Sequence, residues 1–251
     1  MNIALYGQRK NRWAMTERRA GALARDAASL TIGPSGLQWS GGELIATIKE
    51  RGAPLPYAIR GTIRVTPETM TSASFDLDRA GQHHWQPYAP RARVEVVFTE
   101  PSLRWSGWGY MDRNFGSRRL EDDFDSWDWS RAHFGTRSAV LYNATGSNAR
   151  PEPLALTIEQ GGALDLFEAP RNHHLPKTLW RIDRQTQADS GQPAKVIRTL
   201  EDTPFYARST IETSLLGRRC MAVHETLSLS RFSNPIVKAM LPFRMPRVFW
   251  R

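Results

Sequence analysis

The stretch from Trp105 to Phe134 gathers side chains that could carry out acid–base chemistry beside aromatic rings. It contains four tryptophans, together with arginines, a histidine and a run of carboxylates from Glu121 to Asp128. Carboxylates crowded into an apolar site cannot all stay ionised, because desolvation and like-charge repulsion raise the pKa of at least one. A carboxylic acid that remains protonated near neutral pH is what a general acid requires. We therefore expect a proton donor in this stretch.

The proton donor is expected among three of these carboxylates. Asp123 and Asp125 are the first candidates, and Asp122 is the third. The alternative interpretation of any one of them is a solvated acidic loop that leads into a strand. Arg118 and Arg119, which immediately precede the cluster, would then simply neutralise it.

The residues after the cluster are predicted to form a strand that displays functional groups on one face. Successive strand side chains point to opposite sides, so Asp125, Trp127, Trp129, Arg131 and His133 share a face. The two indoles would stabilise a nearby cation by ~0.5–2 kcal/mol each. The arginine or the histidine would orient the acid or position a water molecule. Either tryptophan taken alone is more typical of a strand core, where aromatic residues are common.

Other residues could line the same pocket for a long apolar substrate. They are Trp105, Trp108 and Tyr110, with Asp112 and Trp13 as further candidates. An acid beside aromatic faces is suited to protonate an alkene and to stabilise the carbocation until it is captured.

Composition limits the class of protein. The chain has 251 residues, 40% hydrophobic and 24% charged, which is typical of a folded protein with one large domain or two small ones. The single cysteine, Cys220, excludes an intramolecular disulfide framework and is expected to be a buried strand residue. No apolar run approaches the roughly 20 residues that span a bilayer. We expect a cytoplasmic protein or one peripheral to the cytoplasmic membrane.

The formal net charge of +9 requires an explanation. The arginines are scattered and no nucleic-acid-binding motif is present, so nucleic acid is not expected as a partner. The tail Asn234–Arg251 mixes large apolar side chains with basic ones only. It is predicted either to wrap around the domain or to anchor the protein on an anionic membrane surface, and Pro235, Pro242 and Pro246 argue against one long helix.

Signatures of metal or cofactor binding are weak. The pairs His83-His84 and His173-His174 are adjacent, so their side chains would point apart on a strand and not ligate one metal ion. Gly107 and Gly109 are not followed by a helical pattern, as a dinucleotide-binding loop requires. We expect neither a metal nor a cofactor.

Short strands separated by turn signals predict an all-β protein built as barrels or sandwiches. Gly36–Ser40 and Glu43–Lys49 are predicted to form a hairpin around two glycines, and only Thr16–Ala28 has a helical pattern. The apolar start, Met1–Gly7, reads as a strand that we expect to follow further strands. The remaining predicted strands are Leu30–Ile32, Tyr57–Val65, Arg93–Phe98, Ser102–Tyr110, Ser126–Phe134, Ser138–Asn143, Leu154–Glu159, Thr178–Asp183, Lys195–Thr199, Phe205–Thr213 and Cys220–Ser230.

The dipeptide Glu100-Pro101 interrupts two strand patterns and marks a predicted boundary. We expect an N-terminal β half over residues 1–101 and a C-terminal β half over 102–251 that carries the basic apolar tail.

Several segments of the chain resemble the carotenoid 1,2-hydratase family, also called hydroxyneurosporene synthase. The resemblance covers nearly the whole chain, and the W-x-W-S-R-A-H and L-P-F-R-M-P-R motifs are its most specific parts. The arrangement G-Y-x-D/E followed by W-x-W is also similar to tocopherol cyclases and other lipocalin-like proteins that handle isoprenoids. The matching segments are Asn2–Arg18, Leu30–Trp39, Ala89–Val96, Trp105–Phe134 and His224–Arg247.

This resemblance implies a calycin-like, or lipocalin-like, fold of two β-barrel or sandwich halves. It also implies a hydro-lyase that needs no cofactor and adds water to the terminal C1=C2 double bond of acyclic carotenoids such as neurosporene or lycopene. Protonation at C2 would give a tertiary cation at C1, which water then captures.

Two alternatives remain open. A cyclase or pericyclase acting on an isoprenoid or polyene would use the same apolar pocket but exclude water. A lipocalin-like carrier would bind an isoprenoid without changing it, although burying carboxylates in a purely apolar carrier costs stability without benefit.

Overall fold

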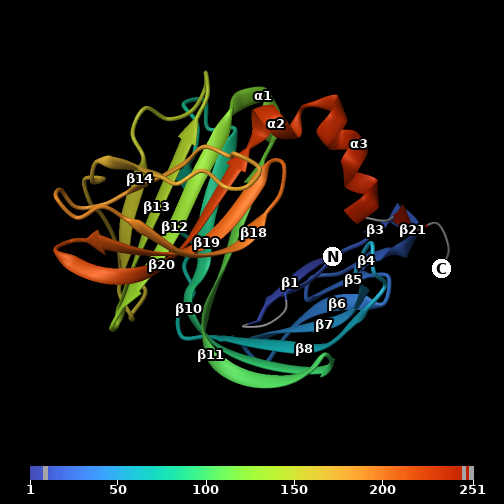
Figure 1. Cartoon of the computed structure of the whole chain (residues 1–251). Helices are drawn as coiled ribbons and strands as arrows, with labels where there is room; N and C mark the ends of the chain where they lie inside the picture. The colour runs from blue at the N-terminus through green and yellow to red at the C-terminus, as the bar shows by residue number, and fades with distance from the viewer. Residues whose placement is uncertain (8–10, 245–246, 249–251) are drawn as a thin grey trace. The chain divides into compact units, whose positions relative to one another are not determined.

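The computed structural model describes residues 1–7, 11–244 and 247–248, and it consists mainly of antiparallel strands (Figure 1). The chain divides into two compact units. Unit 1 comprises Met1–Glu68, Arg91–Met111 and Ala239–Arg251, and unit 2 comprises Thr69–Pro90 and Asp112–Lys238. The two longest strands, β10 (His83–Glu100) and β11 (Ser102–Gly116), each contribute residues to both units. The predicted boundary at residue 101 falls inside unit 1, at the turn between these strands.

The sheet of unit 1 has the strand order β11-β10-β8-β7-β6-β5-β4. The predicted hairpin is confirmed, because Ser40 pairs with Glu43 and the two intervening glycines have positive φ angles of 60° and 80°. Positive φ at both central residues is the geometry of a type I′ turn, which glycine adopts without strain. The remaining strands of this sheet are β4 (Leu23–Arg25), β5 (Ser29–Ile32), β6 (Ser35–Ser40), β7 (Glu43–Arg51) and β8 (Ala58–Pro67).

The core of unit 1 lies between this sheet and the hairpin of β1 (Asn2–Tyr6) and β2 (Asn11–Met15). Alternate residues of the long strands, among them Ile48, Ile59 and Phe98, are buried and pack with apolar residues of the hairpin. The predicted strand at the start of the chain is thus confirmed.

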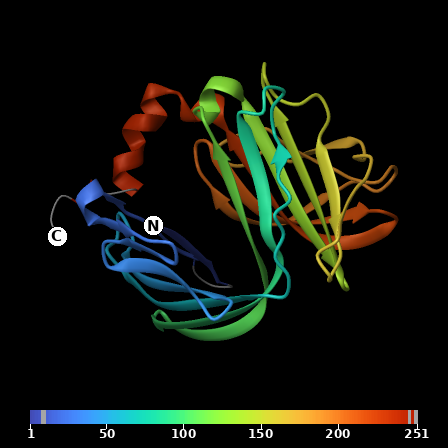
Figure 2. The same ribbon diagram turned by 180° about the vertical axis from the view of Figure 1, so that it is seen from behind.

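Unit 2 contains a seven-stranded antiparallel sheet of order β15-β14-β13-β12-β20-β19-β18 (Figure 2). Its central strand, β12 (Ser126–Phe134), has the predicted bounds. The other strands are β13 (Arg137–Thr145), β14 (Leu154–Ile158), β15 (Leu164–Leu166), β18 (Lys195–Asp202), β19 (Tyr206–Leu215) and β20 (Arg218–Ser228).

The two faces of this sheet differ in character. One face forms a core with Ala132, Leu141, Ile211 and Cys220, covered by the hairpin of β16 (Asn172–Leu175) and β17 (Arg184–Gln187). Burial raises the pKa of the Cys220 thiol, as expected for a buried strand residue. The register places tryptophans and polar residues on the opposite face, which we call the aromatic face and define by Trp127, Trp129, Arg131, Tyr142 and Glu225.

Two predictions require correction. Within Thr16–Ala28 only a short 3-10 helix, Ala20–Ala22, forms between β3 (Glu17–Arg18) and β4, and its start lacks a side-chain cap. The strand predicted over Thr178–Asp183 is wrong. That segment connects β16 to β17 through a turn in which Arg181 has a positive φ of 57° and its N–H bonds the carbonyl of Thr178.

Three helices were not predicted: α1 (Leu120–Asp123), α2 (Leu229–Phe232) and α3 (Pro235–Arg244). Helix α3 occupies part of the basic apolar tail and begins at Pro235, where the missing N–H would have no partner within the helix. A short parallel pairing joins β3 to β21 (Arg247–Val248), while tail residues 245–246 and 249–251, Pro246 among them, lie outside the described residues.

Gly61 offers a test of packing in unit 1. A Cβ atom there would lie 2.5 Å from both the Phe98 ring and the Val97 carbonyl oxygen, so Gly61→Ala must displace β10. We expect it to lower the free energy of unfolding by about 1–3 kcal/mol. Gly21→Ala is the matched control, because no heavy atom lies within 4 Å of the corresponding Cβ. Equal thermal midpoints for the two variants would contradict this account.

Candidate active site

A continuous row of side chains crosses the aromatic face of unit 2. Tyr142 in β13 pairs with Trp129 in β12, Trp129 pairs with Glu225 in β20, and Glu225 pairs with Arg208 in β19. Directly opposed residues of neighbouring strands lie on the same face, so this register brings distant parts of the sequence together.

The last part of β11 adds polar groups to this row. The Trp85 indole N–H in β10 donates to Asp112 Oδ2 at 2.8 Å, and the Tyr142 hydroxyl donates to Asn114 Oδ1 at 3.1 Å. Asp112 and Asn114 are alternate residues of β11 and therefore point the same way. The rings of Trp85 and Tyr142 approach to 6.0 Å between centroids. Asp112 is thus held beside the aromatic row.

Asp112 is the carboxyl group whose environment favours its protonated form. Burial raises its pKa above the ordinary value, and the negative charge of Glu225 acts in the same direction. The hydrogen bond from Trp85 and the positive charge of Arg131 oppose the increase without cancelling it. A carboxyl group with a raised pKa beside aromatic side chains is suited to transfer a proton to an apolar substrate.

The aromatic groups around Asp112 are themselves uncharged. Burial, followed by the charges of Asp112 and Glu225, raises the pKa of Tyr142 well above its ordinary value, so its hydroxyl stays protonated. Trp127 meets Tyr142 edge-on, with 5.7 Å between ring centroids. Together these rings provide π surface beside the acid.

The structure places the three predicted proton donors elsewhere. Asp122 and Asp125 are exposed, and the side chain of Asp125 accepts a long hydrogen bond from Ser230. Asp123 is buried, and Oδ2 lies 2.8 Å from His83 Nε2 and accepts from Arg118 Nε at 2.9 Å. Its hydrogen bond with His83, then that from Asn148, lowers the pKa of Asp123 despite burial. The environment of Asp123 therefore favours its carboxylate form and does not support proton donation.

The predicted alternation along β12 is confirmed for four residues. Trp127, Trp129, Arg131 and His133 share the aromatic face by register. Arg131 Nη2 donates to the carbonyl of Pro90 at 2.8 Å and to the Ser138 hydroxyl at 3.0 Å. His133 Nδ1 lies 3.1 Å from the same hydroxyl.

The remaining predicted pocket residues belong to unit 1. Trp105 and Trp108 are exposed, and the guanidinium groups of Arg91 and Arg93 lie 3.9 and 4.7 Å from the Trp108 ring centroid. Tyr110 is half-buried in β11, and the backbone of Trp13 both donates to and accepts from the Tyr57 hydroxyl.

Sequence reasoning missed five members of the row and its surroundings: Trp85, Asn114, Tyr142, Arg208 and Glu225. Only Trp85 could have been predicted from local pattern. The strand predicted from Arg93 begins at His83 in the structure, and extending its alternation to that residue places His83 and Trp85 on one face. The other positions depend on register between distant strands.

The adjacent histidines His83 and His84 contact different carboxylates. His83 binds Asp123, whereas His84 Nδ1 lies 2.8 Å from Asp76 on the other side of β10. Within residues 1–7, 11–244 and 247–248 there is no group of three His, Cys, Asp or Glu side chains that could hold a metal ion.

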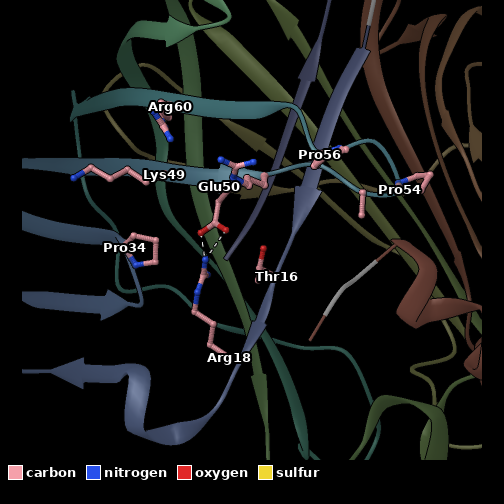
Figure 3. A pocket seen from close by; sticks show the side chains of 11 residues that line it. Thr16, Arg18, Pro34, Lys49, Glu50, Pro54, Pro56 and Arg60 are labelled. Atoms are coloured by element: carbon pink, nitrogen blue, oxygen red, sulfur yellow. Dashed lines mark hydrogen bonds and ion pairs between the residues drawn. The ribbon is translucent and has the colours of Figure 1, made fainter. Parts of the chain in front are cut away.

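Unit 1 contains a cavity of about 760 Å³, lined in part by Thr16, Arg18, Glu50 and prolines (Figure 3). Burial acts to raise the pKa of Glu50, but hydrogen bonds from Arg18, Ser35 and Thr16 lower it below the ordinary value. Arg18 binds both carboxylate oxygens, at 3.0 and 2.8 Å. This carboxylate is engaged in a buried ion pair and is a poor proton donor.

Two units built of antiparallel sheets, one of which holds a half-buried carboxyl group beside aromatic rings, define a lipocalin-like β protein. Solved structures agree: an AttH-like protein from Nitrosomonas europaea superposes with a TM-score of 0.60 at 12% identity, covering 88% of this chain and 76% of that one. The structure of CghA with Sch210972 gives a TM-score of 0.54 at 10% identity, covering 92% of this chain and 74% of that one. The all-β, lipocalin-like prediction is therefore confirmed.

The chain belongs to the carotenoid hydratase CrtC family, whose family model matches residues 1–251. It is 49% identical to the acyclic carotenoid 1,2-hydratase of Thiocapsa roseopersicina over 99% of its length, and 43% identical to that of Rubrivivax gelatinosus over 98%. The chain spans about three fifths of those relatives, 62% and 61% of their lengths. The relative from Cereibacter sphaeroides is 37% identical over 98% of this chain and 88% of its own.

Asp123→Asn tests the structural role of the buried hydrogen bond between His83 and Asp123. A carboxyl group whose pKa is lowered by folding stabilises the protein above its unfolded value, here 3.8, and that contribution disappears as pH falls through the folded value. We therefore expect the variant to melt below the wild type at neutral pH, with a difference that shrinks below pH 3.8. Melting curves from pH 7 to 2 measure this, with the exposed Asp122→Asn as control. A difference independent of pH would contradict the assignment.

Proposed function

We propose that the protein catalyses the addition of water to the terminal C1=C2 double bond of an acyclic carotenoid such as neurosporene or lycopene. Membership of the carotenoid hydratase family supports this reaction class, as does the similarity to acyclic carotenoid 1,2-hydratases. The observation that carries the proposal is the half-buried carboxyl group of Asp112, whose pKa is raised, held by the Trp85 indole beside Tyr142.

In the proposed mechanism, Asp112 transfers its proton to C2 of the substrate. The positive charge then develops at C1, because a tertiary cation is more stable than the secondary one that protonation at C1 would give. The faces of Trp85, Trp127 and Tyr142 stabilise this cation electrostatically by ~0.5–2 kcal/mol per ring. Water attacks C1 and loses a proton, which gives the tertiary alcohol. The net reaction is the addition of one water to the double bond.

The same acid could serve a cyclase if water were excluded from the cation. A polyene cyclase would return the proton and yield an isomer, whereas hydration adds the mass of one water. A carrier would have no use for a carboxyl group whose pKa is raised by burial, since burying a carboxylate costs stability. Mass analysis of the product separates these functions.

Asp112→Asn tests the proton donor. The amide keeps an oxygen for Trp85 but cannot donate a proton to carbon, so we expect hydration of lycopene to fall by about 10²–10⁴-fold. Because folding raises the pKa of Asp112, the ionised form costs stability at neutral pH, and the uncharged variant should melt no lower than the wild type.

Asp122→Asn and Asp125→Asn are matched controls for this experiment, because both side chains are exposed carboxyl groups near β12. We expect both to retain hydration. In the wild type, activity should decline as pH rises through the raised pKa of Asp112, since the acid must be protonated to act. Full activity of Asp112→Asn would refute its role.

We also propose that α3 docks on an anionic membrane surface, where a lipid-dissolved substrate would be met. Ile236 and Phe243 are 72% and 78% exposed, and Met240 between them is also exposed. Their spacing places them on one side of the helix. The helix has Lys238 and no acidic residue, so its charge complements anionic headgroups. Among the described residues, no helix is long and apolar enough to cross a bilayer.

Replacing Ile236 and Phe243 with serine tests this docking. Each large apolar side chain contributes about 1.5–3 kcal/mol when buried in lipid, so each replacement should weaken partitioning roughly tenfold or more. Flotation with phosphatidylglycerol vesicles measures binding, which added salt should also weaken. Leu179→Ser is the control, because Leu179 is 97% exposed but lies outside the helix. Equal binding by all variants would contradict the proposal.

A further inference from the structure

Glu225 is a second carboxylate on the aromatic face, and the mechanism above does not use it. Its Oε1 lies 2.7 Å from Nη2 of Arg208, its cross-strand neighbour. Both side chains are only partly exposed, so the ion pair is fixed within the sheet. Trp129 lies directly across from Glu225 on the other side. An ion-paired carboxylate is therefore held at a defined place on the face that presents the acid.

Glu225 and Asp112 lie within electrostatic reach of each other. The charge of Glu225 raises the pKa of Asp112, and the charges of both raise that of Tyr142. Tyr142, Trp129 and Glu225 occupy successive strands, which are about 4.8 Å apart in a sheet. The two carboxyl groups thus flank the same set of rings.

The approach to Glu225 along β20 is apolar. Val223 and Met221 follow it at alternate positions toward the start of the strand, on the same face, and both are exposed. Exposed apolar side chains in line with a carboxylate suit a long hydrocarbon whose reactive end reaches the acid and its partner.

On the basis of the hydration activity proposed above, we propose that Glu225 accepts the proton of the attacking water. In the first step the O–H bond of Asp112 breaks and a C–H bond forms at C2. The water oxygen then bonds to C1, and one of its protons passes to a carboxylate oxygen of Glu225. A proton finally returns from Glu225 to Asp112 through solvent water, which restores both groups. The net change is the addition of one water.

This division of labour has a physical rationale. A cation between two carboxylates is stabilised by both negative charges. A single carboxyl group would have to protonate C2 and also accept the proton of the water that attacks C1. Inverting glycosidases likewise use two separated carboxyl groups, one as acid and one as base for the water between them.

Glu225→Gln tests the proposal when lycopene is incubated with the full chain in D2O. We expect hydration to fall by about 10²–10⁴-fold, as for loss of a general base. Deuterium should still enter C2 of the recovered lycopene, because Asp112 can protonate the alkene and take a proton back. Asp112→Asn should abolish both hydration and deuterium incorporation, so failure of the acid and failure of the base give different results.

Glu159→Gln is the control, because Glu159 forms an ion pair with Arg137, which lies opposite Phe134 on the other face of the sheet. This variant should retain both hydration of lycopene and deuterium incorporation at C2. If Glu225→Gln unfolds, Glu225→Asp keeps the charge but retracts the carboxylate, and about tenfold slower hydration with retained deuterium incorporation is expected. Unchanged hydration in the folded variant, or parallel loss of hydration and deuterium incorporation, would overturn the role of Glu225 as base.

Discussion

The hydrogen bond from the Trp85 indole to Asp112 is the interaction on which the candidate site depends. It ties the start of β10 to the end of β11 and directs the carboxyl group toward the aromatic row. An indole N–H donates but cannot accept, so it satisfies one carboxyl oxygen without removing the proton that the other can carry. Burial then raises the pKa of Asp112, because one neutral hydrogen bond is too weak to compensate for desolvating a carboxylate.

Asp112 and Asp123 show how environment divides one residue type into two roles. Both lie in unit 2, but Asp123 is surrounded by His83, Arg118 and Asn148, which all donate to or attract a negative charge. Asp112 has aromatic neighbours and a nearby carboxylate. Asp123, whose partners stabilise its negative charge, is suited to stabilise the fold. Asp112, whose pKa is raised, is suited to hold a proton.

This difference also explains what the sequence could and could not predict. Strand β12 and its alternation follow from local pattern, since Trp127, Trp129, Arg131 and His133 recur with period two. Crowding of Asp122, Asp123 and Asp125 is visible in the sequence and predicts a raised pKa. The hydrogen bond from the distant His83, which lowers the pKa of Asp123, is not visible there. Trp129 meets Glu225 only through the pairing of β12 with β20, and no local signal encodes that register.

Asp123 nevertheless serves the site indirectly, through the position of β10. Its bond to His83 fixes the strand two residues before Trp85, and Gly116 allows β11 to approach at the same point. A Cβ atom at Gly116 would lie 2.4 Å from the Gln82 carbonyl oxygen and 2.9 Å from His83 Nδ1, so only glycine permits this spacing. The backbone N–H of Ser117 then bonds the Gln82 carbonyl at 3.0 Å. Because Trp85 and Asp112 lie on these same two strands, the buried hydrogen bond and the glycine contact together set the geometry in which the acid is held.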